Sequence, residues 1–486
     1  MSKKKKKQDL IVSLPSMDEA KRRASLRSDA INYQPVISQQ LKDYARDRKY
    51  YIHTYGCQAN VRDGEIMAGM LEEIGFSSTD NYKEASIIII NTCAVRENAE
   101  DKVFGEVGNL KGIKDKTADV IAVCGCMVEE PVITQKIMKT YPHVNLIFGT
   151  HEVPYLVEYI DKLLFSYCAR VISVKSQGGE VVENLPSIRT NSYKAFVNIM
   201  HGCNKFCTYC IVPYTRGRER SRLSKDILQE CQELINSGCK EITLLGQNVN
   251  AYGKDLKEEL TFAQLLEAVA KLGIKRLRFT TSHPWDFTSD IIDVIAEYDN
   301  IMKYIHLPFQ SGNDEILKLM GRRYTAASYK KIIDEMKAKI PNLSLSTDII
   351  VGFPNETYEQ FKDTLEMVDY VKYDSAFTFI YSPRPGTPAA SMEDNVSLEE
   401  KHKRFNELVK TCEKYITESA SKMIGKIYPV LVDGPSKNNP EMFSGYTESS
   451  KLVHFKCHDS SLIGEIVNVK IVESHTYSMI GELVNG

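Results

Sequence analysis

Three cysteines fall within eight residues of this chain, in the segment Cys203-Asn-Lys-Phe-Cys207-Thr-Tyr-Cys210. Thiolates at this spacing can turn toward one shared centre and hold an iron–sulfur cluster. A closed structural zinc site needs four ligands, and no further Cys or His follows nearby. A [4Fe–4S] cluster held by three cysteines leaves one iron open to another ligand. The alternative is three core cysteines that are close by chance, and the spacing favours the cluster.

A second set of cysteines is spread along the N-terminal part, where Cys57, Cys93 and Cys126 each follow a predicted strand. Because the carboxyl ends of parallel strands converge on one crevice, these three predict a second cluster site. Spacing alone leaves buried core cysteines as an equal alternative. Cys124 competes with Cys126 as the third ligand, but it lies inside its strand. The remaining cysteines have no partner spacing and are predicted to be structural: Cys168, Cys231, Cys239, Cys412 and Cys457.

Alternating strands and helices must position both cysteine sets. Residues 49–165 predict a doubly wound parallel sheet with strands at 50–55, 86–91, 120–123 and 145–148. Residues 191–422 predict a partial (βα)6 TIM-like barrel, with strands at 193–199, 241–245, 276–280, 303–307, 343–350 and 374–381. Residues 423–486 alternate apolar and polar positions, which predicts a small antiparallel β-barrel. We interpret residues 1–48 as a mobile arm and residues 166–190 as a linker.

The composition is that of an ordinary multidomain protein, with 486 residues, 43% hydrophobic and 26% charged. The net charge of −2 provides no overall basic field, so nucleic acid would have to bind through local patches. No apolar run approaches the roughly 20 residues of a membrane span. Lys3–Lys7 precede only a short apolar stretch, which is not a signal peptide. We therefore expect a cytoplasmic location, where the 12 cysteines stay reduced.

Polar residues that follow the barrel strands are the candidates for binding a cofactor, because βα barrels react at that face. They are Gln247, Asn248, Ser282, His283, His306, Gln310 and Asp348. Each is equally suited to capping or internal hydrogen bonding. Candidates for RNA phosphates are the alternating arginines beyond the cysteine loop, which would share one side of an extended segment, and Arg384 after the sixth strand. The alternating set is Arg216, Arg218, Arg220 and Arg222, and its alternative is a solvated basic loop.

The Cys-x3-Cys-x-aromatic-Cys loop after the first barrel strand resembles the radical S-adenosylmethionine (SAM) superfamily. This resemblance implies that the open iron binds SAM, whose cleavage gives a 5′-deoxyadenosyl radical. It places Tyr209 near the adenine of SAM, with core packing as the alternative role. The superfamily often has Gly-Gly-Glu after the second strand, and this chain has Leu245-Gly246-Gln247 instead.

Further motifs narrow the resemblance. The segments Thr54-Tyr-Gly-Cys-Gln-Ala-Asn60, Asn91-Thr-Cys-Ala-Val-Arg-Glu97 and Gly125-Cys-Met127 are similar to the methylthiotransferase family. Residues 212–222, Val-Pro-Tyr-Thr-Arg-Gly-Arg-Glu-Arg-Ser-Arg, resemble its tRNA-modifying MiaB branch. Residues 423–486 resemble a TRAM domain, in which four aromatic residues stack on bases or fill the core: Tyr428, Phe443, Tyr446 and Phe455.

The resemblance implies an enzyme that converts N6-isopentenyladenosine at tRNA position 37 to its 2-methylthio derivative, with two [4Fe–4S] clusters and two SAM. The first cysteine set would generate the radical, and the Cys57, Cys93 and Cys126 set would donate sulfur. Expected partners are the tRNA anticodon stem-loop, an electron donor such as flavodoxin or ferredoxin, and a sulfur source or carrier. We expect a monomer without a membrane partner.

Two alternatives remain open. Within the family, the substrate would be threonylcarbamoyl-adenosine in tRNA or an aspartate of a ribosomal protein, and residues 212–218 argue against both. From another class, the chain would be a non-catalytic iron–sulfur protein with an RNA-binding or redox role.

Overall fold

A computed structural model describes residues 8–16, 18, 30–94, 97–114, 116–175, 181–437, 439 and 441–484. The chain forms two compact units. The first consists of Met1–Thr190, Met200–Phe206 and Cys210–Arg222, and the second of Asn191–Ile199, Cys207–Tyr209 and Leu223–Gly486. The expected lysine tract at residues 3–7 lies outside the described residues. No helix among the described residues is long and apolar enough to cross a bilayer.

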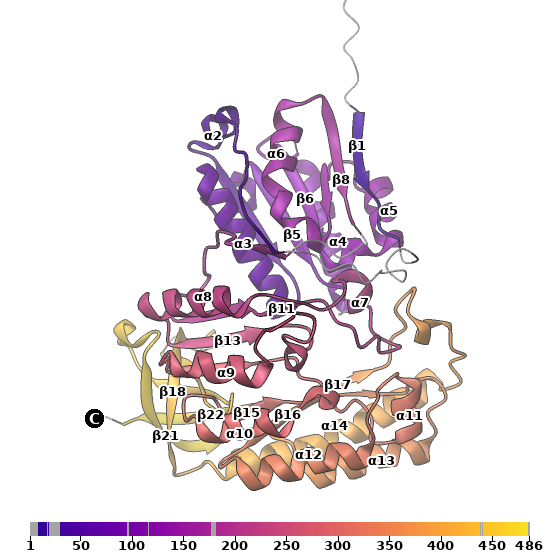
Figure 1. The fold of residues 1–486 in the computed structure, drawn as a ribbon, viewed down its shortest axis with the longest axis vertical. Coiled ribbons are helices and arrows are strands. Elements are labelled where there is room, and N and C mark those ends of the chain that lie inside the picture. The colour runs from indigo at the N-terminus through magenta and orange to yellow at the C-terminus, as the bar shows by residue number, and fades with distance from the viewer. Residues whose placement is uncertain are drawn as a thin grey trace, which may run out of the picture. The chain divides into compact units, whose positions relative to one another are not determined.

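A seven-stranded parallel sheet forms the centre of the first unit (Figure 1). Its strands, in spatial order, are β1 (Gln8–Ser13), β8 (Cys168–Ser173), β7 (Leu146–Phe148), β6 (Val120–Gly125), β5 (Ile87–Thr92), β3 (Lys49–Thr54) and β4 (Ser77–Ser78). Every residue of β5 and β6 is buried. Continuous apolar strands of this kind need helices on both faces.

Helices cover both faces of this sheet. On one face, α2 (Gln39–Ala45), α3 (Gln58–Ile74) and α6 (Leu156–Phe165) pack against alternate residues of the strands. On the other face lie α4 (Glu97–Asn109) and α5 (Pro131–Thr140). The predicted doubly wound sheet is therefore confirmed.

Two predictions for the ends of this unit are wrong. Residues 1–48 are not one mobile arm, because β1 pairs in parallel with β8 and α2 packs into the core. The predicted linker at 166–190 contains β8 itself, and β9 (Val181–Glu183) pairs with β2 (Ala30–Asn32). Short strands of this kind acquire their hydrogen bonds only from distant partners, so local periodicity does not reveal them.

The second unit contains the predicted partial barrel. Strands β10 (Lys194–Asn198), β13 (Glu241–Leu245) and β14 (Arg276–Phe279) form one parallel sheet. Strands β15 (Tyr304–His306), β16 (Ser344–Val351) and β17 (Ser375–Ile380) form another. A bridge from Leu277 to Ile301, just before β15, links the two sheets.

Helices follow the barrel strands. They are α8 (Ser224–Asn236), α9 (Phe262–Lys271), α10 (Ser289–Glu297), α11 (Asp314–Leu319), α12 (Ala326–Lys339), α13 (Tyr358–Val371) and α14 (Leu398–Ser421). Capping boxes begin α9 at Thr261 and α13 at Thr357. Each supplies hydrogen bonds to backbone groups that the first helical turn leaves without partners.

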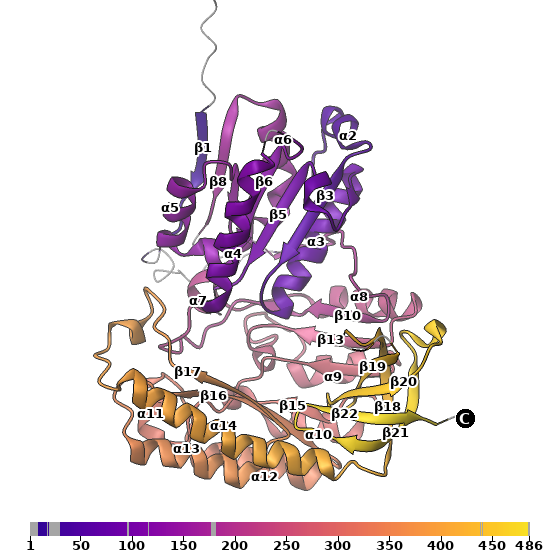
Figure 2. The same ribbon diagram turned by 180° about the vertical axis from the view of Figure 1, so that it is seen from behind.

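A closed five-stranded barrel ends the second unit, as Figure 2 shows in yellow. Its strands are β18 (Ile427–Pro435), β19 (Met442–Thr447), β20 (Leu452–Lys456), β21 (Ile466–Ser474) and β22 (Ser478–Leu483). The prediction of an antiparallel barrel holds except between β20 and β22, which run parallel. Phe443 and Phe455 fill its core, whereas the Tyr446 ring is 36% exposed.

Buried polar contacts attach this barrel to the rest of the second unit. Arg276 in β14 is 1% exposed, and it donates to the carbonyl oxygens of Tyr446 at 2.9 Å and Pro429 at 2.8 Å. Lys194 in β10 forms an ion pair with Asp433. A buried guanidinium without such acceptors would cost several kcal/mol, so these contacts fix the barrel on β14.

Candidate metal centre

The three cysteines of the first unit lie at the carboxyl ends of adjacent strands. Cys57 follows β3 and is the N-cap of α3, Cys93 follows β5, and Cys126 follows β6 as the first residue of a short 3-10 helix, η3 (Cys126–Glu129). Strands β3, β5 and β6 are consecutive neighbours in the sheet. The topology therefore brings the three cysteines to one edge, as the sequence pattern predicts.

Two glycines give these cysteines the room to approach one another. Gly56 has φ +111°, and a Cβ added there would lie 2.9 Å from Cys93 Sγ. Gly125 has φ +94°, and its added Cβ would lie 2.6 Å from Asn91 Oδ1 and 2.8 Å from Thr92 N. Only glycine adopts these backbone angles without strain and also leaves this space. The turns before Cys57 and Cys126 therefore require the glycines of the two motifs.

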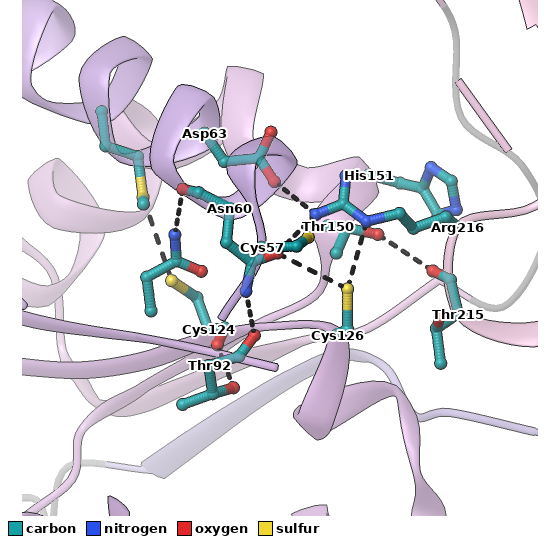
Figure 3. A network of polar contacts seen from close by, with 12 residues as sticks. Cys57, Asn60, Asp63, Thr92, Cys124, Cys126, Thr150, His151, Thr215 and Arg216 are labelled. Atoms are coloured by element: carbon teal, nitrogen blue, oxygen red, sulfur yellow. Dashed lines mark hydrogen bonds and ion pairs between the residues drawn. The ribbon is translucent and has the colours of Figure 1, made fainter. Parts of the chain in front are cut away.

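Asn60 and Arg216 connect Cys57 and Cys126 in one polar network (Figure 3). The amide oxygen of Asn60 is 4.0 Å from Cys57 Sγ and 3.8 Å from Cys126 Sγ. Its amide nitrogen donates to the carbonyl oxygens of Tyr55 at 2.9 Å and Thr92 at 2.8 Å. Since Tyr55 directly follows β3 and Thr92 ends β5, Asn60 fixes the spacing of the two strand ends.

Arg216 supplies the positive charge in this network. Its Nε donates to Cys126 Sγ at 3.2 Å, and its Nη2 donates to Asn60 Oδ1 at 2.6 Å and to Asp63 Oδ2 at 2.8 Å. Burial opposes the charged form, but the neighbouring Cys126 and Asp63 outweigh it and raise the pKa of Arg216. The guanidinium therefore stays protonated beside the thiols.

The thiols differ in protonation. A hydrogen bond with Cys93 is the main cause that lowers the pKa of Cys57 to about 5; burial opposes it and the Arg216 charge adds to it. Burial raises the pKa of Cys126 to about 11. The thiolate is the form that ligates metals. Cys57 is therefore already in its ligating form at neutral pH, whereas Cys126 must lose its proton when a metal binds.

The alternative ligand Cys124 does not fit. Its side chain belongs to the apolar core between the sheet and α3, is 1% exposed, and contacts Met67 Sδ at 3.9 Å. Burial raises the pKa of its thiol well above the ordinary value. Cys126 instead packs in a separate cluster with Ala94, Ile211 and Tyr214. Cys126 is therefore the better candidate.

Within the described residues, no three His, Cys, Asp or Glu side chains are grouped to hold a single metal ion. A [4Fe–4S] cluster spans more space than one ion, because each cysteine binds a different iron. Cys57 and Cys126 both lie beside Asn60, and Cys93 forms a hydrogen bond with Cys57. This arrangement, with space left by Gly56 and the nearby Arg216 cation, fits such a cluster.

The loop of Cys203, Cys207 and Cys210 is held at several points. In the first unit, Cys203 N donates to Gly217 O at 2.9 Å. In the second unit, Arg322 Nη1 lies 3.6 Å from Cys207 Sγ, and Thr208 N donates to Met320 O at 2.9 Å. Phe206 has φ +49°. A bulky residue in the left-handed region costs about 1–3 kcal/mol, a strain typical of ligand-binding loops.

Buried polar atoms at the strand ends of the second unit match a polar ligand such as SAM. Ser282 Oγ, Gln310 Oε1 and Asn250 Nδ2 meet no hydrogen-bond partner within the part of the chain that the structure describes. All three residues are at most 7% exposed. Since buried polar atoms are normally satisfied, these are the best candidates for direct cofactor contacts. Ser282 and Gln310 were predicted from the sequence, and Asn250 was missed.

Other predicted cofactor contacts have internal partners. Asn248 is 1% exposed and donates to Asp286 Oδ2 at 2.7 Å. Asp348 Oδ2 lies 3.5 Å from His306 Nε2. These contacts are the hydrogen-bonding roles that the sequence left as alternatives. The partly buried Tyr209 ring packs against an apolar cluster that includes Met320.

The remaining polar candidates lie beside these residues at the strand ends. Gln247 directly precedes Asn248 and is half-buried. His283 accepts at Nδ1 from Trp285 N at 3.2 Å and caps a short 3-10 helix, η6 (Pro284–Asp286). Gln247 therefore stays a prediction, whereas His283 has a structural role.

The four arginines at 216, 218, 220 and 222 do not form one row of exposed side chains, because Arg216 is buried and Arg222 is paired internally. Residues 212–215 form a helical turn, α7 (Val212–Thr215), and Arg216 is buried beside Cys126. Arg222 pairs with the buried Glu183 at 2.7 Å. Arg220 lies 3.3 Å from His151 Nδ1. Local sequence could not reveal these partners, because they come from distant parts of the chain.

A small cavity of about 70 Å³ adjoins the network in the first unit. Its lining includes Asp63, Thr150, His201, Arg216 and Arg220. Burial is the main cause that lowers the pKa of His201, and the three neighbouring arginines add to it. Asn60 belongs to a motif that was recognised in the sequence, but the motif alone indicates no role for it. Asp63, one helical turn later on α3, was missed.

Comparison with known proteins agrees with the three domains. Residues 197–368 match the Radical SAM superfamily, residues 49–149 match Uncharacterized protein family UPF0004, and residues 421–484 match the TRAM domain. A solved radical SAM methyltransferase, TsrM from Kitasatospora setae, shares the fold, with a TM-score of 0.53 and 12% identity over 71% of this chain and 74% of that one. Fold and motifs thus define a radical SAM enzyme with a TRAM domain.

Close relatives specify the family. The tRNA-2-methylthio-N(6)-dimethylallyladenosine synthase of Geobacillus kaustophilus is 49% identical over 97% of this chain and 88% of its own length. The synthase of Staphylococcus epidermidis (strain ATCC 12228) is 49% identical over 97% of this chain and 91% of its own. The chain belongs to this family of tRNA methylthiotransferases.

Proposed function

We propose that this protein converts N6-isopentenyladenosine at tRNA position 37 to the 2-methylthio derivative, with two [4Fe–4S] clusters and SAM. The single observation that carries the proposal is the near full-length similarity at 49% identity. Two three-cysteine sets in one chain support it, because the C2–H bond of adenine has no acidic proton and needs radical chemistry.

The motifs and the contacts described above support a role for each set of residues. Cys203, Cys207 and Cys210 would hold the cluster that, with SAM, supplies a 5′-deoxyadenosyl radical for removal of the C2 hydrogen. Ser282, Gln310 and Asn250 would orient SAM through buried atoms that otherwise meet no partner among the described residues. A SAM molecule held in one orientation would keep its 5′ carbon close to the hydrogen on adenine C2, so less entropy is lost when the two react.

The second set, Cys57, Cys93 and Cys126, would hold the sulfur-donating cluster. Asn60 fixes two of the strand ends, and Arg216 balances the negative charge of the thiolates. Arg218 and Arg384 stay candidates for RNA phosphates. Tyr446 is the most exposed of the four barrel aromatics predicted to stack on a base or fill the core. Domain boundaries at 49–165, 191–422 and 423–486 are part of the proposal.

The proposed partners are the tRNA anticodon stem-loop, a low-potential electron donor such as flavodoxin or ferredoxin, and a sulfur source or carrier. We place the enzyme in the cytoplasm as a monomer, where tRNA and reduced thiols coexist.

A reconstitution experiment tests this proposal. Anaerobically reconstituted protein should bind about eight irons, and a Cys203→Ala/Cys207→Ala/Cys210→Ala variant about four. With a reductant, SAM and tRNA that carries N6-isopentenyladenosine, the wild type should release 5′-deoxyadenosine and form the 2-methylthio nucleoside. Wild-type protein that saturates near four irons would contradict the two-cluster assignment.

The same assay separates the alternatives. Methylthiolation of tRNA with threonylcarbamoyl-adenosine, but not of isopentenyl tRNA, would favour the other substrate. Iron binding without any release of 5′-deoxyadenosine from SAM would favour a non-catalytic iron–sulfur protein.

A further inference from the structure

We propose that Arg216 is a positioning residue for the sulfur-donating cluster: its guanidinium hydrogen-bonds the Cys126 sulfur and sets the reduction potential of that cluster. The proposal rests on the assignment of Cys57, Cys93 and Cys126 as ligands. The sequence suggested phosphate binding for Arg216, whereas the structure buries it to 7% exposure.

Three acceptors surround the one guanidinium, and each comes from the methylthiotransferase sheet region. Arg216 Nε donates to Cys126 Sγ at 3.2 Å, and Nη2 donates to Asn60 Oδ1 at 2.6 Å and Asp63 Oδ2 at 2.8 Å (Figure 3). The planar guanidinium donates from two of its nitrogens and so reaches all three acceptors at once, whereas the single ammonium group of a lysine does not. The arrangement is therefore specific to arginine.

The backbone around Arg216 is held so that the side chain cannot easily turn away. Thr150 Oγ1 donates to Thr215 O at 3.0 Å, and Cys203 N donates to Gly217 O at 2.9 Å. Arg216 N itself donates to Val212 O at 2.8 Å. Hydrogen bonds to the residues before and after Arg216 therefore hold its backbone in place.

Charge gives the positioning role a chemical consequence. Three thiolates and the Asp63 carboxylate would meet at this strand edge, and Arg216 is a cation that contacts both a cysteine sulfur and this carboxylate. Hydrogen bonds to the sulfurs and the net charge nearby set the potentials of iron–sulfur clusters. Loss of the guanidinium should therefore favour the oxidised cluster and make the reduction potential more negative.

The same segment links the two cysteine sets in the chain. Only five residues separate Arg216 from Cys210, and Ile211 packs in one apolar cluster with Cys126. A change at Arg216 is thus expected to affect the Cys126 side directly. Arg222 offers a matched control, since it is an arginine of the same segment that forms an ion pair with the carboxylate of Glu183.

The test uses protein in which the radical cysteines are replaced by alanine, so that a single cluster is observed. In this background, Arg216→Gln, Arg216→Lys and Arg222→Gln are reconstituted anaerobically and titrated by EPR-monitored redox potentiometry. We expect a more negative midpoint potential for Arg216→Gln, an intermediate value for Arg216→Lys, and an unchanged value for Arg222→Gln. An Arg216→Gln potential equal to that of the parent, at equal iron content, would overturn the proposal.

Poor cluster loading is also informative. If Arg216→Gln binds less iron, Arg216→Lys should recover part of the loading, because it restores the charge without the fork. Equal iron loss in Arg222→Gln would instead mean that the segment only stabilises the fold, and would overturn the positioning role. In the chain with all cysteines, release of 5′-deoxyadenosine by wild type checks the proposed function independently of these potentials.

Discussion

Gly125→Ala should displace Cys126 and loosen the end of the central sheet. The added Cβ would lie 2.6 Å from Asn91 Oδ1 and 2.8 Å from Thr92 N, and alanine would have to adopt φ +94°. A non-glycine residue in a strained conformation costs about 1–3 kcal/mol. Forcing a methyl group into a packed site costs about 1–3 kcal/mol more. The expected loss of local stability is therefore about 2–6 kcal/mol.

Hydrogen exchange followed by mass spectrometry measures this loss where it should occur. Because about 1.4 kcal/mol corresponds to a factor of ten, peptides that cover β5 and β6 should exchange at least about 30-fold faster in the variant. Iron content should fall from about eight to about four per chain, since one of the two cysteine sets is displaced.

Gly105→Ala is the matched control. Gly105 lies inside α4, and a Cβ there meets nothing within 4 Å. This change should be neutral or stabilise the helix by about 0.5–1 kcal/mol. If Gly125→Ala exchanges like Gly105→Ala and keeps its full iron content, the account of the strand-end turn is wrong.

Three further predictions concern the second unit. Ser282→Ala should weaken SAM binding about five- to tenfold in equilibrium dialysis, since one buried hydrogen bond is worth about 1–1.5 kcal/mol; unchanged affinity would remove Ser282 from the site. Arg384→Ala should weaken tRNA binding and reduce the salt-dependence slope by about one, whereas an unchanged slope would exclude a phosphate contact. Burial is the main cause that raises the pKa of the Glu356 carboxyl above its ordinary 4.5. The protonated Glu356 carboxyl stabilises the fold fully below pH 4.5, and this stabilisation is lost as the pH rises through the raised pKa. In urea titrations, the free energy of unfolding of Glu356→Gln should therefore rise relative to that of the wild type as the pH increases. A difference between the two proteins that does not change with pH would contradict this prediction.

Sequence patterns predicted elements whose signals are local. The predicted strands at 241–245 and 276–280 match β13 (Glu241–Leu245) and β14 (Arg276–Phe279), because apolar residues within these short runs mark them. Strands β5 and β6 are apolar runs between turn signals. The position of Cys126 at a strand end also followed from sequence, since parallel strands end together.

Features that depend on distant partners were missed. Strand β1 is an exposed edge strand that exists through its pairing with β8, more than 150 residues away in sequence. Arg216 looks like part of a solvated basic run until Asp63 and Cys126 are brought beside it. A run of charged residues predicts exposure to solvent. An arginine can be buried only where the tertiary fold supplies partners that offset the loss of hydration of its charge.

Mass spectrometry of tRNA nucleosides tests the central claim most directly. Cells that lack this chain should accumulate N6-isopentenyladenosine in tRNA, and re-expression of the wild type should restore 2-methylthio-N6-isopentenyladenosine. Re-expression of a Cys57→Ala/Cys93→Ala/Cys126→Ala variant should not restore it. A 2-methylthio-adenosine pool that is the same with and without the chain would contradict the account.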